Sequence, residues 1–192
     1  MQRIIVAITG ASGSVYAVRL LKILLEQPRE VHLIVSEWGE RVTEHELGYD
    51  VNRLEEFVVG QKAKLIRHDN DDLFAAPASG SFEHDGMVIV PCSMRTLGSV
   101  ASGIAASLIE RAADVCLKER RPLILVPRET PLSAIHIQNM LRVTEAGAIV
   151  LPPSPAFYTQ PQSVDDLIDF IVSRILNQLG IEHNLTGEWN GK

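Results

Sequence analysis

The chain has 192 residues, 46% of them hydrophobic and 22% charged, so it can bury a core but is too short for two domains of ordinary size. Its formal net charge of −6 argues against a general nucleic-acid binder or a protein that binds anionic membranes, because both need a basic surface. The two cysteines, Cys92 and Cys116, are too few for a disulfide scaffold and fit a reducing cytosol. We expect a cytoplasmic protein with one domain over residues 1–180 and a C-terminal tail over residues 181–192.

Short apolar runs rich in β-branched residues alternate with segments of helical period. The runs cover residues 4–8, 31–35, 87–90, 123–126 and 148–151. Strands without polar alternation are buried on both faces, so this order predicts a parallel sheet with helices on each side, an α/β fold of the open, doubly wound kind. The first run stops at Thr9-Gly10 and is too short for an export signal or a membrane span.

Two later helices are delimited by their caps. Ser163 is followed by the acidic residues Asp165 and Asp166, and the apolar helical pattern then runs to Gly180. This is the pattern of an N-cap, a negative first turn and a glycine stop. Ser133 similarly opens a helical segment that ends at Gly147.

In open parallel sheets, ligands bind beyond the carboxyl ends of the strands, so the residues that follow each strand matter most. Gly10-Ala11-Ser12-Gly13 follows the first strand and is compatible with either a phosphate cradle or a plain strand-to-helix turn. The spacing is not G-x-G-x-x-G, so the dinucleotide fingerprint is absent. Ser36, after the second strand, is typical of a helix N-cap.

Arginines follow the third and fourth of these strands. Arg95 stands in Pro91-Cys92-Ser93-Met94-Arg95-Thr96 and Arg128 in Pro127-Arg128-Glu129-Thr130-Pro131. A charge at the edge of a core needs a partner. One interpretation is an internal ion pair of either arginine with Glu129; the other is a site for a phosphorylated, planar ligand.

Other charged and aromatic residues give weaker signals. Arg111 and Lys118 are seven residues apart, share one helix face and fit a second phosphate, although cations near a helix end are favourable without any ligand. The run Asp69-Asn70-Asp71-Asp72 reads as a solvated turn rather than a magnesium site, and the six histidines lack metal-ligand spacing. Trp189, in a polar tail, suggests docking on an interface or a ligand.

Several motifs in register resemble the UbiX/Pad1 flavin prenyltransferases over essentially the whole chain. They are Gly10-Ala11-Ser12-Gly13, Ser79-Gly80-Ser81-Phe82, Pro91-Cys92-Ser93-Met94-Arg95-Thr96, Arg111-Ala112-Ala113-Asp114-Val115, Leu117-Lys118-Glu119-Arg120, Pro127-Arg128-Glu129-Thr130-Pro131-Leu132 and Pro155-Ala156-Phe157-Tyr158. The resemblance implies a flavodoxin-like or Rossmann-like fold, a dodecamer built from trimers, and no metal. It also implies transfer of a dimethylallyl group from dimethylallyl monophosphate to N5 and C6 of reduced FMN. The product, prenylated FMN, is the cofactor of a UbiD-type decarboxylase.

The same resemblance assigns site residues by position. Those that would hold FMN are Gly10, Ala11, Ser12, Ser36, Ser93, Met94, Arg95, Thr96 and Arg128. Those that would hold the substrate phosphate are Tyr158 and Arg174, with Lys118 and Arg111 beside them. Glu129 would be the acid/base near that phosphate, and Glu46 would reach in from a neighbouring subunit; Ser12 is also a candidate catalytic residue. Phe82 and Trp189 would wall the prenyl group.

Two further classes of function stay open at this point. A flavin-dependent cysteine decarboxylase would share the first half of the pattern but would need a catalytic histidine and an asparagine-containing substrate loop that the sequence lacks. An FMN-binding accessory subunit of a phenolic-acid decarboxylase would bind flavin without needing Arg111, Lys118, Tyr158 or Arg174. An NAD dehydrogenase is disfavoured by the glycine spacing.

Overall fold

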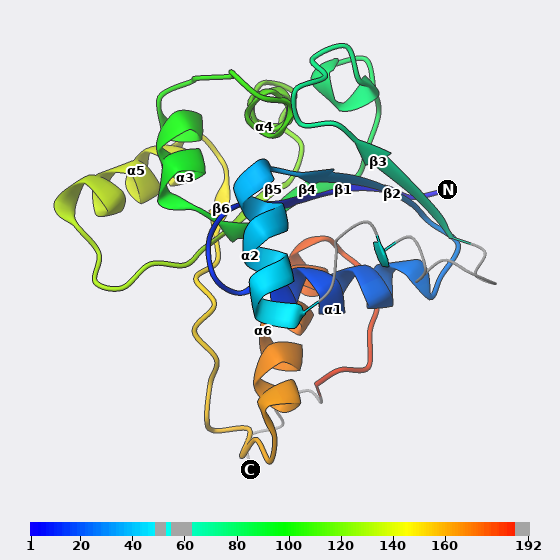
Figure 1. The fold of residues 1–192 in the computed structure, drawn as a ribbon, viewed down its shortest axis with the longest axis vertical. Coiled ribbons are helices and arrows are strands. Elements are labelled where there is room, and N and C mark those ends of the chain that lie inside the picture. The colour runs from blue at the N-terminus through cyan, green and yellow to red at the C-terminus, as the bar shows by residue number, and fades with distance from the viewer. Residues whose placement is uncertain (49–52, 55–62, 187–192) are drawn as a thin grey trace.

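The computed structural model describes residues 1–48, 53–54 and 63–186, and it contains one six-stranded parallel sheet with the strand order β3-β2-β1-β4-β5-β6 (Figure 1). The strands are β1 (Arg3–Ile8), β2 (Glu30–Val35), β3 (Lys64–His68), β4 (Gly86–Cys92), β5 (Leu123–Pro127) and β6 (Ile149–Val150). The helices are α1 (Ser14–Leu25), α2 (Glu37–Leu47), α3 (Met94–Ala101), α4 (Leu108–Lys118), α5 (Ala134–Glu145) and α6 (Val164–Gln178), and Ala76–Ala78 forms the short 3-10 helix η2. This strand order is that of the Rossmann arrangement, which confirms the predicted doubly wound α/β class.

All five predicted strands form, and the predicted helices begin at Ser163 and Ser133 as their caps indicated. The sixth strand, β3, has the sequence KLIRH, whose charged residues hide the apolar pattern used to find the others. It is an edge strand, hydrogen-bonded to β2 alone and only partly buried, so polar residues are tolerated there.

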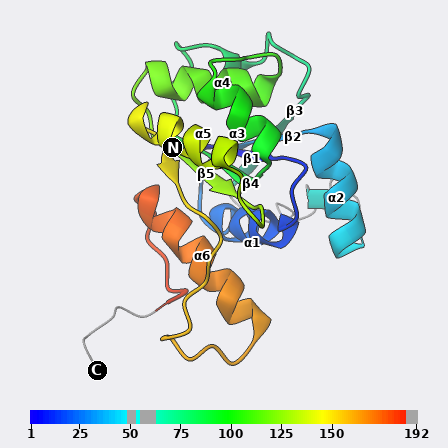
Figure 2. The same cartoon turned by 90° about the vertical axis from the view of Figure 1, so that its left-hand side faces the viewer.

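Alternate residues of each central strand face opposite layers of helices. Ile4, Val6 and Ile8 of β1 belong to the core beneath α1 and α6, whereas Ile5 and Ala7 belong to the core beneath α3, α4 and α5. Figure 2 shows these two helical layers on either side of the sheet. Helix α2 packs against the end of β1: a Cβ added at Gly39 would lie 2.6 Å from the Ile8 carbonyl oxygen.

The first residues of the predicted tail pack on this chain. Ile181 is 4% exposed and Leu185 packs against the same core as α6, so this part of the tail is ordered by its own subunit. Within the described part of the chain, no helix combines the length and apolarity that crossing a bilayer requires.

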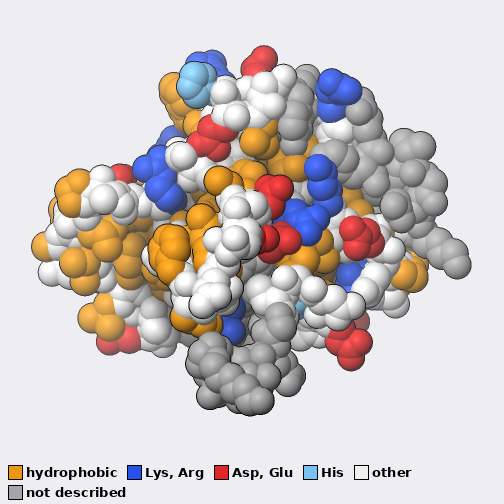
Figure 3. Space-filling view, turned by 90° about the horizontal axis from the view of Figure 1, so that it is seen from below, with side chains coloured by type: hydrophobic (Ala, Val, Ile, Leu, Met, Phe, Trp, Pro, Cys, Tyr) orange, Lys and Arg blue, Asp and Glu red, His pale blue; other side chains and the backbone are white. Residues whose placement is uncertain are grey.

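Helix α5 carries an apolar face that no described residue covers. Ile135, Ile137 and Leu141 are 68%, 55% and 57% exposed, and Val143 is the only residue of this helix that is fully buried. In Figure 3 hydrophobic side chains gather over the region of α5. An apolar surface of this kind is typical of a protein–protein interface.

A cluster of histidines lies at the sheet edge formed by β2, β3 and the segment before β4. His32 is 3% exposed; one ring nitrogen lies 2.9 Å from a Glu30 carboxylate oxygen and the other 2.8 Å from His68 Nε2. His84 is 9% exposed, its Nδ1 has no hydrogen-bond partner among the described residues, and burial lowers its pKa to about 4. Burial also lowers the pKa values of His32 and His68. The folded protein therefore keeps these rings neutral.

Acid is expected to destabilise the protein through His84. In the unfolded chain this ring takes up a proton below about pH 6.5, whereas the folded pKa is about 4, so the stabilisation is complete above the unfolded value and is lost as the pH falls toward the folded value. Between pH 7 and pH 5 we expect His84 alone to lower the free energy of unfolding by about 2 kcal/mol. Urea unfolding at fixed protein concentration, at both pH values, measures this fall.

His84→Phe tests this assignment because it removes the titrating ring. His45→Phe, which replaces an exposed histidine on α2, is its matched control. The fall should shrink in the first variant and persist in the second. A His84→Phe profile parallel to that of the unsubstituted protein would contradict the assignment.

Candidate functional site

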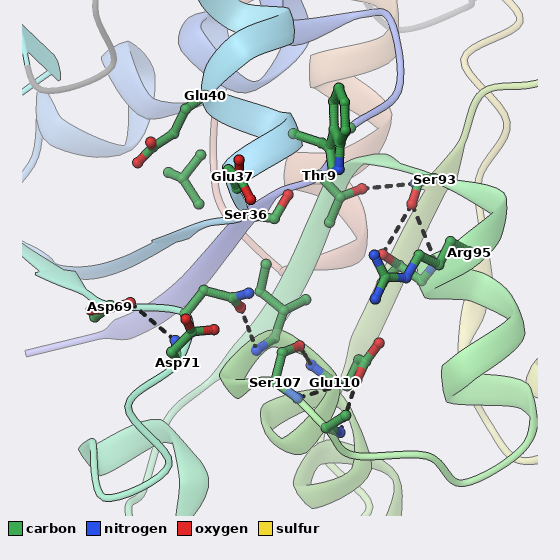
Figure 4. A pocket seen from close by; sticks show the side chains of 17 residues that line it. Thr9, Ser36, Glu37, Glu40, Asp69, Asp71, Ser93, Arg95, Ser107 and Glu110 are labelled. Carbon is green, nitrogen blue, oxygen red and sulfur yellow. Dashed lines mark hydrogen bonds between the residues drawn. The ribbon is translucent and has the colours of Figure 1, made fainter.

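A cavity of about 540 Å³ lies beyond the carboxyl ends of β1 to β4; we call it the strand-end cavity. It is next to the point between β1 and β4 where the strand order reverses, the place where open α/β sheets bind ligands. Figure 4 shows Ser36 and Glu37 on one side of this cavity, Ser107 and Glu110 on the opposite side, and Arg95 between them.

Three helices begin at this cavity, and each has a serine N-cap. Ser36 Oγ accepts a hydrogen bond from the Gly39 amide at 3.1 Å, Ser93 Oγ from the Thr96 amide at 3.2 Å, and Ser107 Oγ from the Glu110 amide at 3.4 Å. The position of Ser36 directly after a strand predicted this role. Because the partial positive ends of α2, α3 and α4 meet here, the cavity favours an anionic group such as a phosphate.

Four of the five acidic residues that line the cavity have hydrogen-bond or ion-pair partners among the described residues. Glu110 Oε2 accepts from the Ala106 and Ser107 amides, and Asp69 Oδ1 accepts from the Asp71 amide. Glu40 is paired with Arg67 and Glu37 with Arg41. Arg95 is the only cation among the described lining residues and has no ion pair with any described residue, so the proposed pairing with Glu129 is wrong.

The Asp69–Asp72 run forms a turn, as the sequence indicated. Asn70 helps to start α4: its carbonyl oxygen accepts from the Leu108 amide at 2.7 Å and its Oδ1 from the Ile109 amide at 3.2 Å. Among the described residues, no group of three or more His, Cys, Asp or Glu side chains is arranged to hold a metal.

Thr9 links the ends of β1 and β4 through two hydrogen bonds. Its hydroxyl donates to the Pro91 carbonyl oxygen at 2.8 Å and accepts from the Ser93 amide at 2.8 Å. The next residue, Gly10, lies against α2, where an added Cβ would be 2.5 Å from Trp38 Cβ. Glycine is therefore required at this position by contact with a neighbouring side chain, a reason that the sequence alone did not reveal.

The turn that follows β1 already holds an anion of its own. A Glu46 oxygen accepts from the Gly13 amide at 3.1 Å and from the Ser14 amide at 2.9 Å, so this carboxylate caps α1 in place of an ordinary N-cap side chain. The interpretation of Gly10–Gly13 as a phosphate cradle is therefore wrong for the amides at the start of α1. Glu46 makes these contacts within its own chain, and its reach into a neighbouring subunit's site stays a prediction.

The turn keeps Glu46 ionised. Desolvation raises the pKa of this carboxyl, but hydrogen bonds from the Ser12 side chain and from the Gly13 and Ser14 amides lower it further, so the net pKa lies below its ordinary value. Ser12, Glu46 and Arg128 line a second cavity of about 370 Å³, here called the Arg128 cavity. Gly10 borders the first cavity and Ser12 the second, so the glycine turn lies between the two.

Arg128 and Glu129 are both exposed on the loop after β5. Arg128 Nε lies 3.4 Å from the Ser12 carbonyl oxygen, and Glu129 Oε1 accepts from the Thr130 amide at 3.0 Å. Arg128 has no ion pair with a described residue, so the internal Arg128–Glu129 pair is also wrong. The second interpretation, an arginine held ready for an anionic ligand, is the one that this geometry supports.

Arg111 and Lys118 share one face of α4, as their spacing predicted, but that face points away from Arg128. Arg111 Nε donates to the Ala78 carbonyl oxygen at 3.1 Å and its guanidinium pairs with Asp114. Lys118 pairs with Glu119 beside Gly80. Lys118 precedes β5 and Arg128 follows it, so the length of a five-residue strand, about 16 Å at the usual rise, separates them within one subunit.

Tyr158 and Arg174 contact the same aromatic ring, on the helical layer opposite α4. Both contact the ring of Phe170 on α6, Tyr158 edge-on with 6.2 Å between centroids and Arg174 with its guanidinium carbon 5.9 Å from the centroid. A tyrosine hydroxyl and an arginine guanidinium are both groups that can bind a phosphate. The sequence had suggested no role for Arg174 apart from the resemblance, because a charged residue on an amphipathic helix reads as solvated.

Phe82, one of the two predicted wall residues, lines neither cavity. Phe82 packs edge-on against His32 and beneath the Arg3 guanidinium, at the amino end of the sheet, so within one subunit it does not line the expected prenyl site. Arg121 holds this segment by donating to the carbonyl oxygens of Phe82 and Gly80. Trp189 lies outside the described residues.

Comparison with known proteins identifies the family to which the chain belongs. Residues 1–176 match the family model described as Flavoprotein, so the chain is a flavoprotein by class. It is 49% identical to flavin prenyltransferase UbiX of Pseudomonas aeruginosa, covering 98% of this chain and 94% of that protein. It is 45% identical to the mitochondrial flavin prenyltransferase PAD1 of Saccharomyces cerevisiae, covering 99% of this chain and 76% of that protein. The chain belongs to the UbiX/Pad1 family of flavin prenyltransferases.

Solved structures agree. The crystal structure of AnUbiX (PadA1), in complex with FMN and dimethylallyl pyrophosphate, superposes with a TM-score of 0.93 at 44% identity, covering 100% of this chain and 98% of that one. The dodecameric FMN-dependent UbiX-like decarboxylase of Escherichia coli O157:H7 superposes with a TM-score of 0.92 at 43% identity, covering 99% and 100%. The FMN-dependent cysteine decarboxylase TvaF is 16% identical with a TM-score of 0.64, a likeness of fold alone.

Proposed function

We propose that the protein binds reduced FMN in the strand-end cavity and transfers a dimethylallyl group to it from dimethylallyl monophosphate, forming bonds at flavin N5 and C6. The observation that carries this proposal is the meeting of three serine-capped helix starts with Arg95 in a cavity at the reversal of the strand order. A phosphate and a planar ring fit such a site. The AnUbiX complex with FMN and dimethylallyl pyrophosphate supports FMN together with a dimethylallyl donor.

Reduced FMN, when bound, would supply an electron-rich ring as the nucleophile toward the allylic carbon, and the protein's own residues would handle the phosphate and the protons. Breaking an allylic C–O bond leaves negative charge on the phosphate, which fixed cations stabilise. Lys118, Arg111 and Arg174 are the cations proposed for this, with the Tyr158 hydroxyl as a donor. Glu129 is proposed to exchange a proton with the leaving phosphate, and holding both reactants together supplies a further part of the acceleration.

The proposed site is complete only between subunits. The Arg128 cavity and Lys118 lie at opposite ends of β5 in one chain, and Tyr158 with Arg174 lies on the far helical layer. We propose a homo-oligomer in which neighbouring chains bring these groups together, as the dodecameric relative from Escherichia coli suggests. The exposed apolar face of α5 supports such an assembly. The product would serve a UbiD-type decarboxylase in the cytoplasm.

Anaerobic incubation of the protein with reduced FMN and dimethylallyl monophosphate, followed by mass spectrometry of the released flavin, tests the proposal. The flavin mass should rise by one dimethylallyl group. An unaltered mass in a folded, flavin-loaded sample would overturn it and favour the accessory-subunit function. A parallel reaction with dimethylallyl pyrophosphate measures donor preference.

A further inference from the structure

Trp38 is an unexplained feature of the strand-end cavity. It is the second residue of α2, and it is the only aromatic side chain among the described residues that line this cavity. It is 57% exposed. A large indole left in solvent at the mouth of a cavity forfeits the burial that would stabilise it, which points to a ligand or partner that covers it.

The position of Trp38 is fixed on two sides. On the protein side its Cβ lies against the glycine turn, so close that a side chain at Gly10 would be 2.5 Å from it. On the outer side the Arg41 guanidinium lies 5.0 Å from the ring centroid, and Arg41 is itself paired with Glu37 one helical turn earlier. These contacts restrain the exposed indole at the edge of the cavity.

The rest of the cavity is too polar to contact a large apolar ring. Its apolar lining side chains other than Trp38 are Val35, Ala106 and Ile109, and the other described lining residues are glycine or polar. Sites for planar ligands usually combine apolar or aromatic surface with a few placed polar groups. The helix starts supply the polar groups and Trp38 supplies the aromatic surface.

We infer that Trp38 contacts the isoalloxazine ring of the bound flavin and is a further flavin-binding residue. This inference rests on the proposed FMN site and adds to it which side chain recognises the ring rather than the phosphate. Stacking of an aromatic side chain on a nucleobase contributes about 1–3 kcal/mol, which corresponds to about one to two orders of magnitude in affinity. We expect a similar contribution from an indole that stacks on a flavin ring.

Titration of the apoprotein with FMN and with lumiflavin, which has the ring but neither ribityl chain nor phosphate, tests the inference. Trp38→Ala should raise the Kd for both ligands by about tenfold or more. Val164→Ala, which shortens an exposed side chain at the first position of α6, is the matched control and should leave both constants unchanged. An unchanged FMN affinity in Trp38→Ala, or a loss for FMN without one for lumiflavin, would overturn the inference.

Trp38→Phe keeps an aromatic face and guards against misfolding of the alanine variant. It should bind FMN within about threefold of the unsubstituted protein. Because a stacked indole quenches flavin emission by electron transfer and phenylalanine does not, the fluorescence of bound FMN should rise in this variant. Emission that stays equally quenched would contradict ring contact. If the unsubstituted protein bound no FMN at all, the proposed function itself would fail, an outcome distinct from these.

Discussion

Arg128→Met and Lys118→Met chains, each inactive alone, are expected to recover prenyl transfer when they assemble together. The structure places Arg128 at one end of β5 and Lys118 at the other, so a site that uses both must draw them from different chains. In a randomly mixed assembly, about a quarter of such sites contain both intact residues. Co-expression with two different tags, purification of the doubly tagged species and the flavin mass assay measure the recovery.

The control for this mixture pairs two residues of one cavity. Arg128 and Glu46 line the Arg128 cavity of the same subunit, so mixed Arg128→Met and Glu46→Gln chains never contain a site with both intact. That mixture should stay at the level of its single variants. Equal recovery in both mixtures, or in neither, would show that Arg128 and Lys118 are not shared between subunits in the way we propose.

Glu129→Gln is expected to slow prenyl transfer at least about a hundredfold, since acid–base catalysis by a positioned side chain contributes about 10²- to 10⁴-fold. FMN affinity should not change. Glu129 is exposed and its one hydrogen bond, from the Thr130 amide, can be kept by a glutamine oxygen, so the fold should tolerate the substitution. Single-turnover mass spectrometry with saturating reduced FMN isolates the chemical steps.

Glu145→Gln provides the comparison for that experiment. It removes an equally exposed carboxylate from the last turn of α5, far along the chain from the loop after β5, and should leave the rate within about twofold. If Glu129→Gln retained the unsubstituted rate in both bond-forming steps, Glu129 would have no role in proton transfer.

Strand runs and helix caps were sufficient to predict most of this fold. Four of the five apolar runs became the interior strands β1, β2, β4 and β5, because burial on both faces selects the same residue types wherever it occurs, and the fifth became the short edge strand β6. Edge strand β3 could not be found in this way. Its Arg67 pairs with Glu40 and its His68 stacks on His32, interactions that depend on the neighbouring elements rather than on any local pattern.

The sequence predicted the position of site residues that closely follow a strand. It did not predict the contacts of residues whose partners are distant in the sequence. Ser36, Ser93 and Arg95 lie at the expected cavity because each follows a strand directly. Glu46 caps a helix that begins 32 positions earlier in the chain, and nothing in the local sequence of α2 indicates this. The environment of Phe82 could not be predicted for the same reason, because it is made by distant residues such as Arg3 and His32.

The exposed isoleucine and leucine side chains on α5 affect how a monomeric form of the protein could be prepared. Substitutions that only break contacts between subunits would leave these apolar side chains exposed to solvent. The separated chains would then be expected to aggregate or to bind other proteins nonspecifically. Replacing Ile135, Ile137 and Leu141 with glutamate or lysine in the same step is the change that would keep an isolated subunit dispersed. Such a soluble monomer would still present the strand-end cavity, since none of the three residues lines it.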